Sequence, residues 1–350
     1  MTIILQILGI GIGLGFLIFI HELGHFTAAR LCSVRVLTFS FGFGPDLVKY
    51  IYKGTKYCIK LIPFGGFVAM AGEDPDKATG ASGEYLSLPW YKKIFIAFAG
   101  PLSNYILAVV FFAAIFNFWG VTQASPLAQI GDTVEAQPAD KAGLKSDDII
   151  KNIDGKSVNT WVDISENLKD KANKTILFTI QRGTYTFNVN VAVAPNPVTD
   201  LGIIGIYPKI IRENVGIFKS IEYGARSAIG QTIMTISYLA DKILNLEKPD
   251  IAGPLGIMQV MAKATKDGVE NYLTLLAIIS VALGLFNLFP IPFVDGGMIV
   301  LFLIEGIIKK RLGLRIIQVY NTIGIIIIGG IFIFATYSDL IRLGVGKLFG

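Results

Sequence analysis

The segment Phe19-Ile20-His21-Glu22-Leu23-Gly24-His25 follows directly on an apolar stretch, Ile3–Ile20, that is long enough to enter a membrane. Its His-Glu-x-x-His pattern contains the only two histidines of the chain. On a helix, residues i and i+4 share a face, so both imidazoles can reach one metal ion, with Glu22 beside the water that such an ion activates. Ionisable side chains at membrane depth cost free energy and are retained mostly where they function. The segment therefore predicts a metal site inside a membrane protein.

Composition places the chain among membrane proteins. Apolar residues make up 53% of the sequence, only 16% of the residues are charged, and the mean hydropathy is +0.59. The stretch ahead of the histidines has no basic n-region and no small-residue cleavage site, so we expect an uncleaved helix and not a signal peptide. Including it, four stretches are long enough to cross a membrane: Ile3–Ile20, Ile94–Trp119, Tyr272 to about Ile308, and Ile316 to about Tyr337.

Lysine and arginine in the short loops predict the orientation. Nine basic residues lie between the first two spans, from Arg30 to Lys93, and four lie between the last two, from Lys309 to Arg315. Short loops rich in Lys and Arg stay in the cytoplasm. We therefore expect the N-terminus and residues 120–270 outside, with the histidines toward the cytoplasmic side. The net charge of +5 is then mostly a matter of topology, and we expect no nucleic-acid binding.

The first cytoplasmic loop is rich in β-branched and aromatic residues. Two runs, Val34–Phe43 and Lys56–Met70, flank the polar tip Lys53-Gly54-Thr55, which predicts a β-hairpin-type element. Gly42-Phe43-Gly44-Pro45 is expected to form a turn. Because the runs are apolar, we expect the element to dip into the membrane boundary, where its backbone must be buried in protein or line a cavity.

Residues 121–271 differ in character from the spans. Higher charge and short β-rich runs predict a small soluble α+β domain over residues 121–200. Amphipathic patterns over 201–271 predict helices that lie at the outer membrane surface. The elements expected in the two regions are strands at Ile149–Ile153, Thr175–Gln181 and Tyr185–Val193, and helices at Val162–Lys169, Ile217–Leu244 and Gly256–Ala264.

The third apolar stretch is too long for one simple span and is interrupted by Asn287–Gly297. Two prolines and a glycine pair in this interruption predict a broken helix, the kind of place where membrane proteins build binding sites. The break carries Asp295, about 23 residues into its span, whereas His21 is about 18 residues into its own. At these similar depths, Asp295 can supply a third ligand beside His21 and His25. A fourth position then stays open for water, as in catalytic zinc sites.

These residues carry a resemblance that runs nearly end to end. The chain resembles the site-2 protease family of intramembrane zinc metalloproteases, in the bacterial branch that contains the regulator-of-sigma-E protease. Residues 121–200 resemble a PDZ domain through Pro138-Ala139-x-x-Ala142-Gly143-Leu144-x-x-x-Asp147, with Ser146 where the family usually has glycine, and the length leaves room for a single PDZ domain. The motifs that match the protease family are His21–His25, Gly42-Phe43-Gly44, Phe64-Gly65-Gly66, Ala99-Gly100-Pro101-Leu102-Ser103-Asn104 and Asn287–Gly296.

The resemblance implies roles for these residues. His21, His25 and Asp295 would bind one Zn²⁺ per chain, and Glu22 would be the general base. Asn287 would hold the substrate backbone, and the dipping loop would pair with the substrate as an added strand. The full set expected to bind substrate is Asn287, Asn104, Gly42, Phe43, Gly44, Gly65 and Gly66.

The resulting expectation is a polytopic α-helical membrane protein with about four transmembrane helices, a membrane-dipping β-hairpin loop and an inserted α+β PDZ domain. Its expected parts are an N-terminal membrane half (1–119), the PDZ domain (121–200), an extracytoplasmic amphipathic helical region (201–271) and a C-terminal membrane half (272–350). We expect it in the bacterial cytoplasmic (inner) membrane, with the N-terminus and the PDZ domain extracytoplasmic.

The expected function is zinc-dependent intramembrane endopeptidase activity on transmembrane segments of membrane proteins. The cleavage would serve regulated proteolysis, such as that of an anti-sigma factor or of signal-peptide remnants. Expected partners are the transmembrane substrate, membrane lipid, and peptide tails at the PDZ domain. An alternative is a PDZ-bearing membrane adaptor with a non-catalytic metal site. A zinc transporter is a third reading, but the spans contain no further series of histidines or acidic residues.

Overall fold

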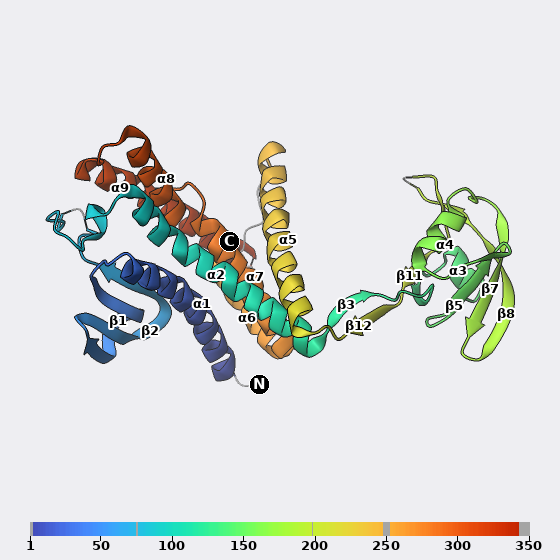
Figure 1. Cartoon of the computed structure of the whole chain (residues 1–350). Helices are drawn as coiled ribbons and strands as arrows, with labels where there is room; N and C mark the ends of the chain where they lie inside the picture. The colour runs from blue at the N-terminus through green and yellow to red at the C-terminus, as the bar shows by residue number, and fades with distance from the viewer. Residues whose placement is uncertain (1–2, 75, 198, 248–252, 343–350) are drawn as a thin grey trace. The chain divides into compact units, whose positions relative to one another are not determined.

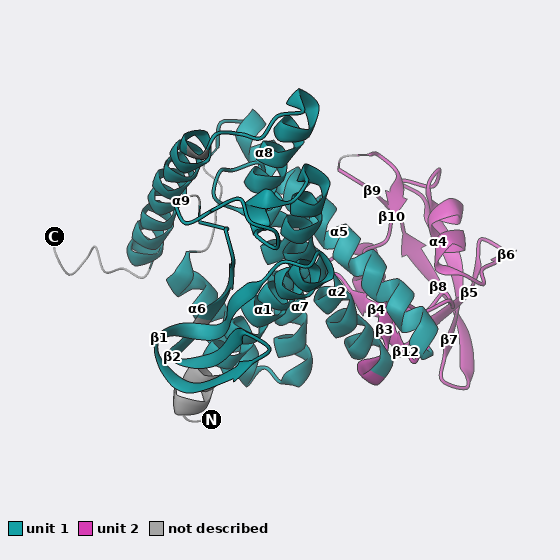
Figure 2. Cartoon of the chain, turned by 60° about the vertical axis from the view of Figure 1, so that its left-hand side comes forward, with its two compact units in different colours: residues 1–117, 216–350 teal, residues 118–215 magenta. Residues whose placement is uncertain are grey.

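The computed structural model describes residues 3–74, 76–197, 199–247 and 253–342 (Figure 1). The chain divides into two compact units (Figure 2). Unit 1 consists of Met1–Asn117 and Gly216–Gly350, and unit 2 consists of Phe118–Val215. Unit 2 is thus inserted into unit 1 in the sequence.

Unit 1 is built mainly of long apolar helices. Four of them contain segments long and apolar enough to cross a membrane: Gly9–Leu31, Trp90–Trp119, Val269–Asn287 and Arg315–Arg342. The third predicted stretch is two helices, because Pro290 and Pro292 cannot continue α7. The helices of this unit are α1 (Ile3–Leu31), α2 (Trp90–Trp119), α5 (Ile217–Leu244), α6 (Pro254–Lys266), α7 (Val269–Asn287), α8 (Asp295–Ile308) and α9 (Leu314–Arg342), with a 3₁₀ turn at Tyr85–Ser87.

Two long strands, β1 (Val36–Tyr52) and β2 (Thr55–Met70), form a hairpin that folds back on itself. The tip is a two-residue turn at Lys53 and Gly54, both with positive φ, which suits the twist of a hairpin. Thr38–Phe41 pairs with the end of β2, where Phe41 lies opposite Gly66, and also with Lys56–Ile59 of the tip half. The predicted turn at residues 42–45 is the place where β1 bends back, and its glycines adopt φ values of +91° and +89°.

Small residues bring α5 close to α2. Ser220, Gly224 and Ala228 are buried at every fourth position, and a Cβ added at Gly224 would lie 2.8 Å from the Val109 carbonyl oxygen. One turn further on, the Tyr105 hydroxyl lies 3.2 Å from the Thr232 hydroxyl. This small-residue face lets the first part of α5, up to Thr232, pack against a candidate span. The placement of the helix over 217–244 at the outer membrane surface stays a prediction.

Unit 2 is a small α+β fold. Its main sheet has the order β6 (Lys156–Ser157), β5 (Ile149–Ile153), β7 (Thr175–Arg182), β8 (Tyr185–Ala192), which confirms the three strands expected here. The other elements are the helices α3 (Pro138–Lys141) and α4 (Trp161–Leu168), and the pairs β3 (Val121–Ala124) with β12 (Ile210–Glu213), β4 (Ile130–Thr133) with β11 (Ile206–Pro208), and β9 (Ala194–Pro195) with β10 (Gly202–Ile203).

The compact unit does not end at the predicted boundary of residue 200. β11 pairs with β4 and β12 pairs with β3, so the chain returns alongside the strands with which the unit began. These pairings extend unit 2 to Val215. The start of the region expected to be helical, 201–271, is therefore strand.

The side chains of β7 alternate between the core of unit 2 and its surface. Phe178 is fully buried, whereas its neighbour Leu177 is 44% exposed. We expect Phe178→Ala to lower the free energy of unfolding of unit 2 by about 3–5 kcal/mol, because it leaves a cavity in the core. The control Leu177→Ala should lower it by less than about 1 kcal/mol. Hydrogen exchange of the sheet amides, followed by mass spectrometry in the whole chain, measures both, and equal effects would contradict this assignment of the core.

Candidate metal centre

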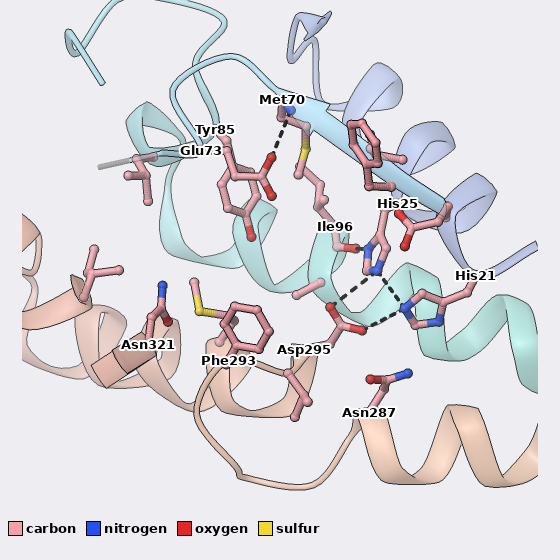
Figure 3. A pocket seen from close by; sticks show the side chains of 18 of the residues that line it. His21, His25, Met70, Glu73, Tyr85, Ile96, Asn287, Phe293, Asp295 and Asn321 are labelled. Carbon is pink, nitrogen blue, oxygen red and sulfur yellow. Dashed lines mark hydrogen bonds and ion pairs between the residues drawn. The ribbon is translucent and has the colours of Figure 1, made fainter. Parts of the chain in front are cut away.

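Three predicted ligands, distant in sequence, meet in unit 1 (Figure 3). His21 and His25 lie one turn apart on α1, and Asp295 is the first residue of α8, directly after the helix break. The His21 Nε2 atom lies 3.2 Å from Asp295 Oδ2 and 3.2 Å from His25 Nε2. The His25 Nε2 atom lies 3.4 Å from Asp295 Oδ1. Two imidazoles and a carboxylate therefore direct their donor atoms at one point.

These distances fit a zinc ion. Ligand atoms about 2.0–2.1 Å from zinc lie about 3.3–3.4 Å from one another when the arrangement is tetrahedral. The three observed separations are close to that edge length. Two histidines and one carboxylate are also a donor set found in catalytic zinc sites, where the fourth position stays open.

Contacts behind the histidines hold the rings in place. The His25 Nδ1 atom lies 2.8 Å from the Ile96 carbonyl oxygen, so its N–H donates there and Nε2 keeps its lone pair for a metal. The His21 Nδ1 atom lies 3.2 Å from the side-chain amide of Asn104, which is fully buried. The Asn104 oxygen has no partner among the described residues. Exchanging the amide oxygen and nitrogen lets this oxygen accept from His21 Nδ1–H, the tautomer that frees His21 Nε2.

Close packing of α2 against α1 seats the histidines. A Cβ added at Gly24 would overlap the Ala99 carbonyl oxygen, and one added at Gly100 would overlap the imidazole of His25 at Nε2. The absence of a side chain at both glycines therefore lets the two helices approach until α2 supports the ring of His25. The Gly100-Pro101 motif of the sequence thus has a steric role at the site.

A cavity of about 530 Å³ opens beside the three donor atoms. α1, β2, α2, the α7–α8 connection and α9 all contribute to its wall. Glu22 lines it next to His21, and a Cβ added at Gly66 would lie 3.5 Å from Glu22 Cγ, so this carboxylate lies against β2. The carboxylate, the donor set and space for a peptide therefore share one enclosed region.

The predicted substrate-binding residues divide into two groups. Asn287, the last residue of α7, lines the cavity. Asn104 does not line it and lies behind His21, so its side chain contacts a predicted metal ligand and not the cavity. The glycines Gly42, Gly44, Gly65 and Gly66 and the side chain of Phe43 also lie outside the cavity wall. Phe43 stacks on Phe67, which does line it, at a centroid distance of 6.3 Å.

Several residues of the cavity wall had not been predicted. The carboxylate of Glu73 accepts a hydrogen bond from the Met70 amide at 2.9 Å, and Tyr85 lies near it in Figure 3. Asn321 of α9 also faces the cavity, and its buried side-chain oxygen has no partner in the described part of the chain. The sequence offers a signal for Asn321, because amide side chains such as those of Gln318 and Asn321 are expensive within an apolar span.

Comparison with known proteins agrees with the geometry. The model of peptidase family M50 matches residues 10–331. A candidate zinc metalloprotease of Agrobacterium fabrum is 31% identical, with 93% of each chain covered. Another, from Clostridium acetobutylicum, is 32% identical with 97% of each chain covered, and one from Rickettsia conorii is 32% identical, covering 96% of this chain and 98% of its own.

Solved PDZ domains match a smaller part of the chain. The PDZ domain of an SdrC-like protein from Listeria monocytogenes covers 25% of this chain and 93% of its own, at 17% identity and a TM-score of 0.22. That of Listeria innocua covers 23% and 92%, at 19% identity and a TM-score of 0.22. At such scores these likenesses carry no argument, and the PDZ assignment stays a prediction.

The family match extends over both halves of the membrane unit, and it includes the histidine motif on α1 as well as Asp295 on α8. Relatives of matching length share about a third of their residues with the chain. The resemblance predicted from the motifs is thereby confirmed, and the chain belongs to peptidase family M50, the site-2 protease family.

Proposed function

We propose that the protein is a zinc-dependent endopeptidase that hydrolyses peptide bonds within transmembrane segments. The observation that carries this proposal is the convergence of His21, His25 and Asp295 beside Glu22, in a cavity walled by candidate membrane spans. One zinc ion per chain would be held by the three converging residues. Such an ion would act as a Lewis acid that polarises a peptide carbonyl. It would also lower the pKa of a bound water to about 7.

Glu22 would move the proton during hydrolysis. Its carboxylate lines the cavity directly beside His21 and is the nearest acidic neighbour of the donor set along α1. It would accept a proton from the attacking water and pass it to the nitrogen of the leaving amine. Ile96 and Asn104 would keep the imidazoles oriented while this happens.

The cavity favours an extended peptide. A helix with its side chains is about 10–12 Å across, and its peptide bonds are shielded by their own hydrogen bonds. Residues 66–70 of β2 pair with β1 and with no second strand among the described residues, and Phe67, Val68 and Met70 of this segment line the cavity. The Met70 amide already donates to Glu73, so the outer edge of residues 66–69 would add an unwound substrate as a further strand and satisfy its backbone groups. The amides of Asn287 and Asn321 would serve other backbone groups of the substrate.

The cellular setting is part of the same proposal. The basic loops favour an orientation with the N-terminus and unit 2 outside and the metal centre toward the cytoplasm. The bacterial relatives favour a bacterial inner membrane, and the apolar runs of the β1–β2 hairpin favour its dipping into the membrane boundary. Unit 2 would be a PDZ domain that reads the outer part or the cleaved tail of substrates, or excludes intact outer domains by size. Anti-sigma factors and signal-peptide remnants fit the substrate class. A PDZ-bearing adaptor with a non-catalytic metal site is the alternative, and the presence of Glu22 in the cavity disfavours it.

Removing the third ligand should remove the metal. We expect about one zinc per chain in the wild type purified in detergent and a large decrease in Asp295→Ala, because two imidazoles alone hold zinc weakly. Elemental analysis measures the ratio. Asp241→Asn, a change in an exposed carboxylate of α5, is the control and should keep its zinc. A full zinc content in Asp295→Ala would exclude this aspartate as a ligand.

Glu22→Gln separates catalysis from metal binding. The amide keeps the size of the side chain but cannot accept the proton, so we expect cleavage of a transmembrane substrate to fall by about 10²- to 10⁴-fold while zinc stays near wild type. Glu222→Gln on α5 serves as the surface control. Cleavage by Glu22→Gln at the wild-type rate would refute the proposed base, and no cleavage by the wild type would favour the adaptor.

The role of unit 2 is testable by a deletion that the structure allows. The Ser125 amide donates to the Lys209 carbonyl at 2.7 Å, so β3 and β12 can be closed by an Asn-Gly turn after removal of residues 126–208. We expect wild type to prefer a substrate with a trimmed outer stub over the same span with an intact outer domain. The deletion variant should cut both at similar rates. An unchanged preference would make unit 2 a passive spacer.

A further inference from the structure

A second cavity, of about 410 Å³, lies in unit 1 between the start of α2 and the end of α8. It shares no residue with the cavity at the metal centre. Its wall is formed by the segment that leads into α2, the last turn of α8 and the turn that follows α8. The residues that line it are Ser87, Leu88, Pro89, Trp90, Glu305, Gly306, Lys309, Lys310 and Arg311.

The wall of this basic cavity carries positive charge that has no acidic partner. Glu305 is its only carboxylate, and both of its oxygens lie 2.7 Å from the buried Lys93 ammonium, which neutralises it. Lys309, Lys310 and Arg311 are exposed and form no ion pair with any carboxylate among the described residues. Three uncompensated cations on one small cavity create a positive potential that favours an anion.

The turn after α8 fixes where these cations stand. Lys309 ends α8 in the left-handed conformation, with φ of +52°, which a side chain other than glycine or asparagine rarely adopts. The Arg311 guanidinium donates to the Ser87 carbonyl oxygen at 2.9 Å, so the turn is tied to the segment before α2. The hydrogen bond thus holds Arg311 and the backbone of the turn beside the cavity, and it brings the neighbouring Lys309 and Lys310 to the same wall.

The basic cavity lies at the boundary of the apolar spans. Trp90 is the first residue of the candidate span Trp90–Trp119, and it is 40% exposed. Its indole packs on α8, where a Cβ added at Gly306 would lie 2.7 Å from the ring. Tryptophan is enriched at membrane interfaces, at the level of the lipid headgroups. Lipid phosphates are the anions that lie at this level, and basic pockets beside spanning helices are known to take lipid headgroups.

We propose that the basic cavity binds the phosphate of an anionic phospholipid headgroup. Lys309, Lys310 and Arg311 supply the charge, and Trp90 supports the glycerol and upper acyl region of the lipid. Lysine and arginine in a cytoplasmic loop also determine membrane topology. That role depends only on how many basic residues the loop contains and does not require them to line a cavity. The basic cavity therefore predicts a binding site of defined stoichiometry, which a general surface charge does not provide.

Native mass spectrometry of the full chain in detergent tests this site. Phosphatidylglycerol and phosphatidylcholine would be titrated separately, and we expect one phosphatidylglycerol to bind in preference to phosphatidylcholine. Lys309→Gln combined with Lys310→Gln should weaken phosphatidylglycerol binding by about 25-fold, at about 5-fold for each lysine near the surface. Lys49→Gln combined with Lys53→Gln removes the same charge from exposed residues of the hairpin, outside the basic cavity, and should change it by less than about twofold.

Three outcomes would overturn the proposal. Equal losses in the two double variants would show a general attraction to positive charge. Unchanged phosphatidylglycerol binding in the Lys309/Lys310 variant would exclude the basic cavity. Displacement of the lipid by millimolar glycerol 3-phosphate or inorganic phosphate would show that the site takes free phosphate and not a lipid. The zinc content of the Lys309/Lys310 variant reports whether its membrane unit is intact, so the result is independent of the proposed protease activity.

Discussion

The structure depends on one electrostatic constraint: a carboxylate and two imidazoles must share a point between apolar helices. Asp295 and His25 are 270 residues apart, and their side chains meet only because the third apolar stretch breaks and restarts at the aspartate. Unpaired ionisable groups at this place would destabilise the fold. The helix break, the approach of α2 to α1 and the contacts behind each ring all serve this meeting point.

The contacts around His21 and His25 restrict the position and the tautomer of each imidazole ring. A side chain at Gly100 would occupy the space of the His25 ring, and the Ile96 carbonyl selects the nitrogen of His25 that faces inward. Asn104 does the same for His21 from a fully buried position, and the Ser280 hydroxyl in turn donates to the backbone carbonyl of Asn104. α7 is therefore linked to a ligand on α1 through a residue of α2. A change in any of these partners would alter the orientation of the rings without touching the ligands themselves.

Much of the site could be predicted from the sequence, because its signals are local. Two histidines at helical spacing, and an aspartate at a break marked by prolines, are visible without a structure. Asn104 was also recognisable as an expensive amide, but its partner is set by helix packing, so its contact with His21 could not be predicted. Asn321 has the same signal, but the sequence does not show that α9 places it beside the metal centre.

The fold was likewise predictable where its signals are local, and not where it depends on contacts between distant segments. The strands of unit 2 follow from their alternating patterns, but its end at Val215 depends on pairing with strands that lie about 80 residues earlier in the chain. The packing of α5 along α2 depends on which side of an amphipathic helix is small, and hydropathy alone does not distinguish that side from a lipid-facing one. The folding back of the hairpin could not be predicted, because it depends on the pairing of one segment of β1 with both halves of β2.

The outer edge of residues 66–69 bears on how such an enzyme would choose among membrane proteins. Main-chain groups are the same in every substrate, so pairing along an edge strand contributes nearly the same free energy to each of them. Discrimination then falls on how readily a transmembrane helix opens. Glycine in a helix interior weakens it by about 1 kcal/mol relative to alanine, and proline by about 3 kcal/mol. Selection at this edge would thus be governed by the conformational stability of the substrate helix more than by the side chains at the cut bond.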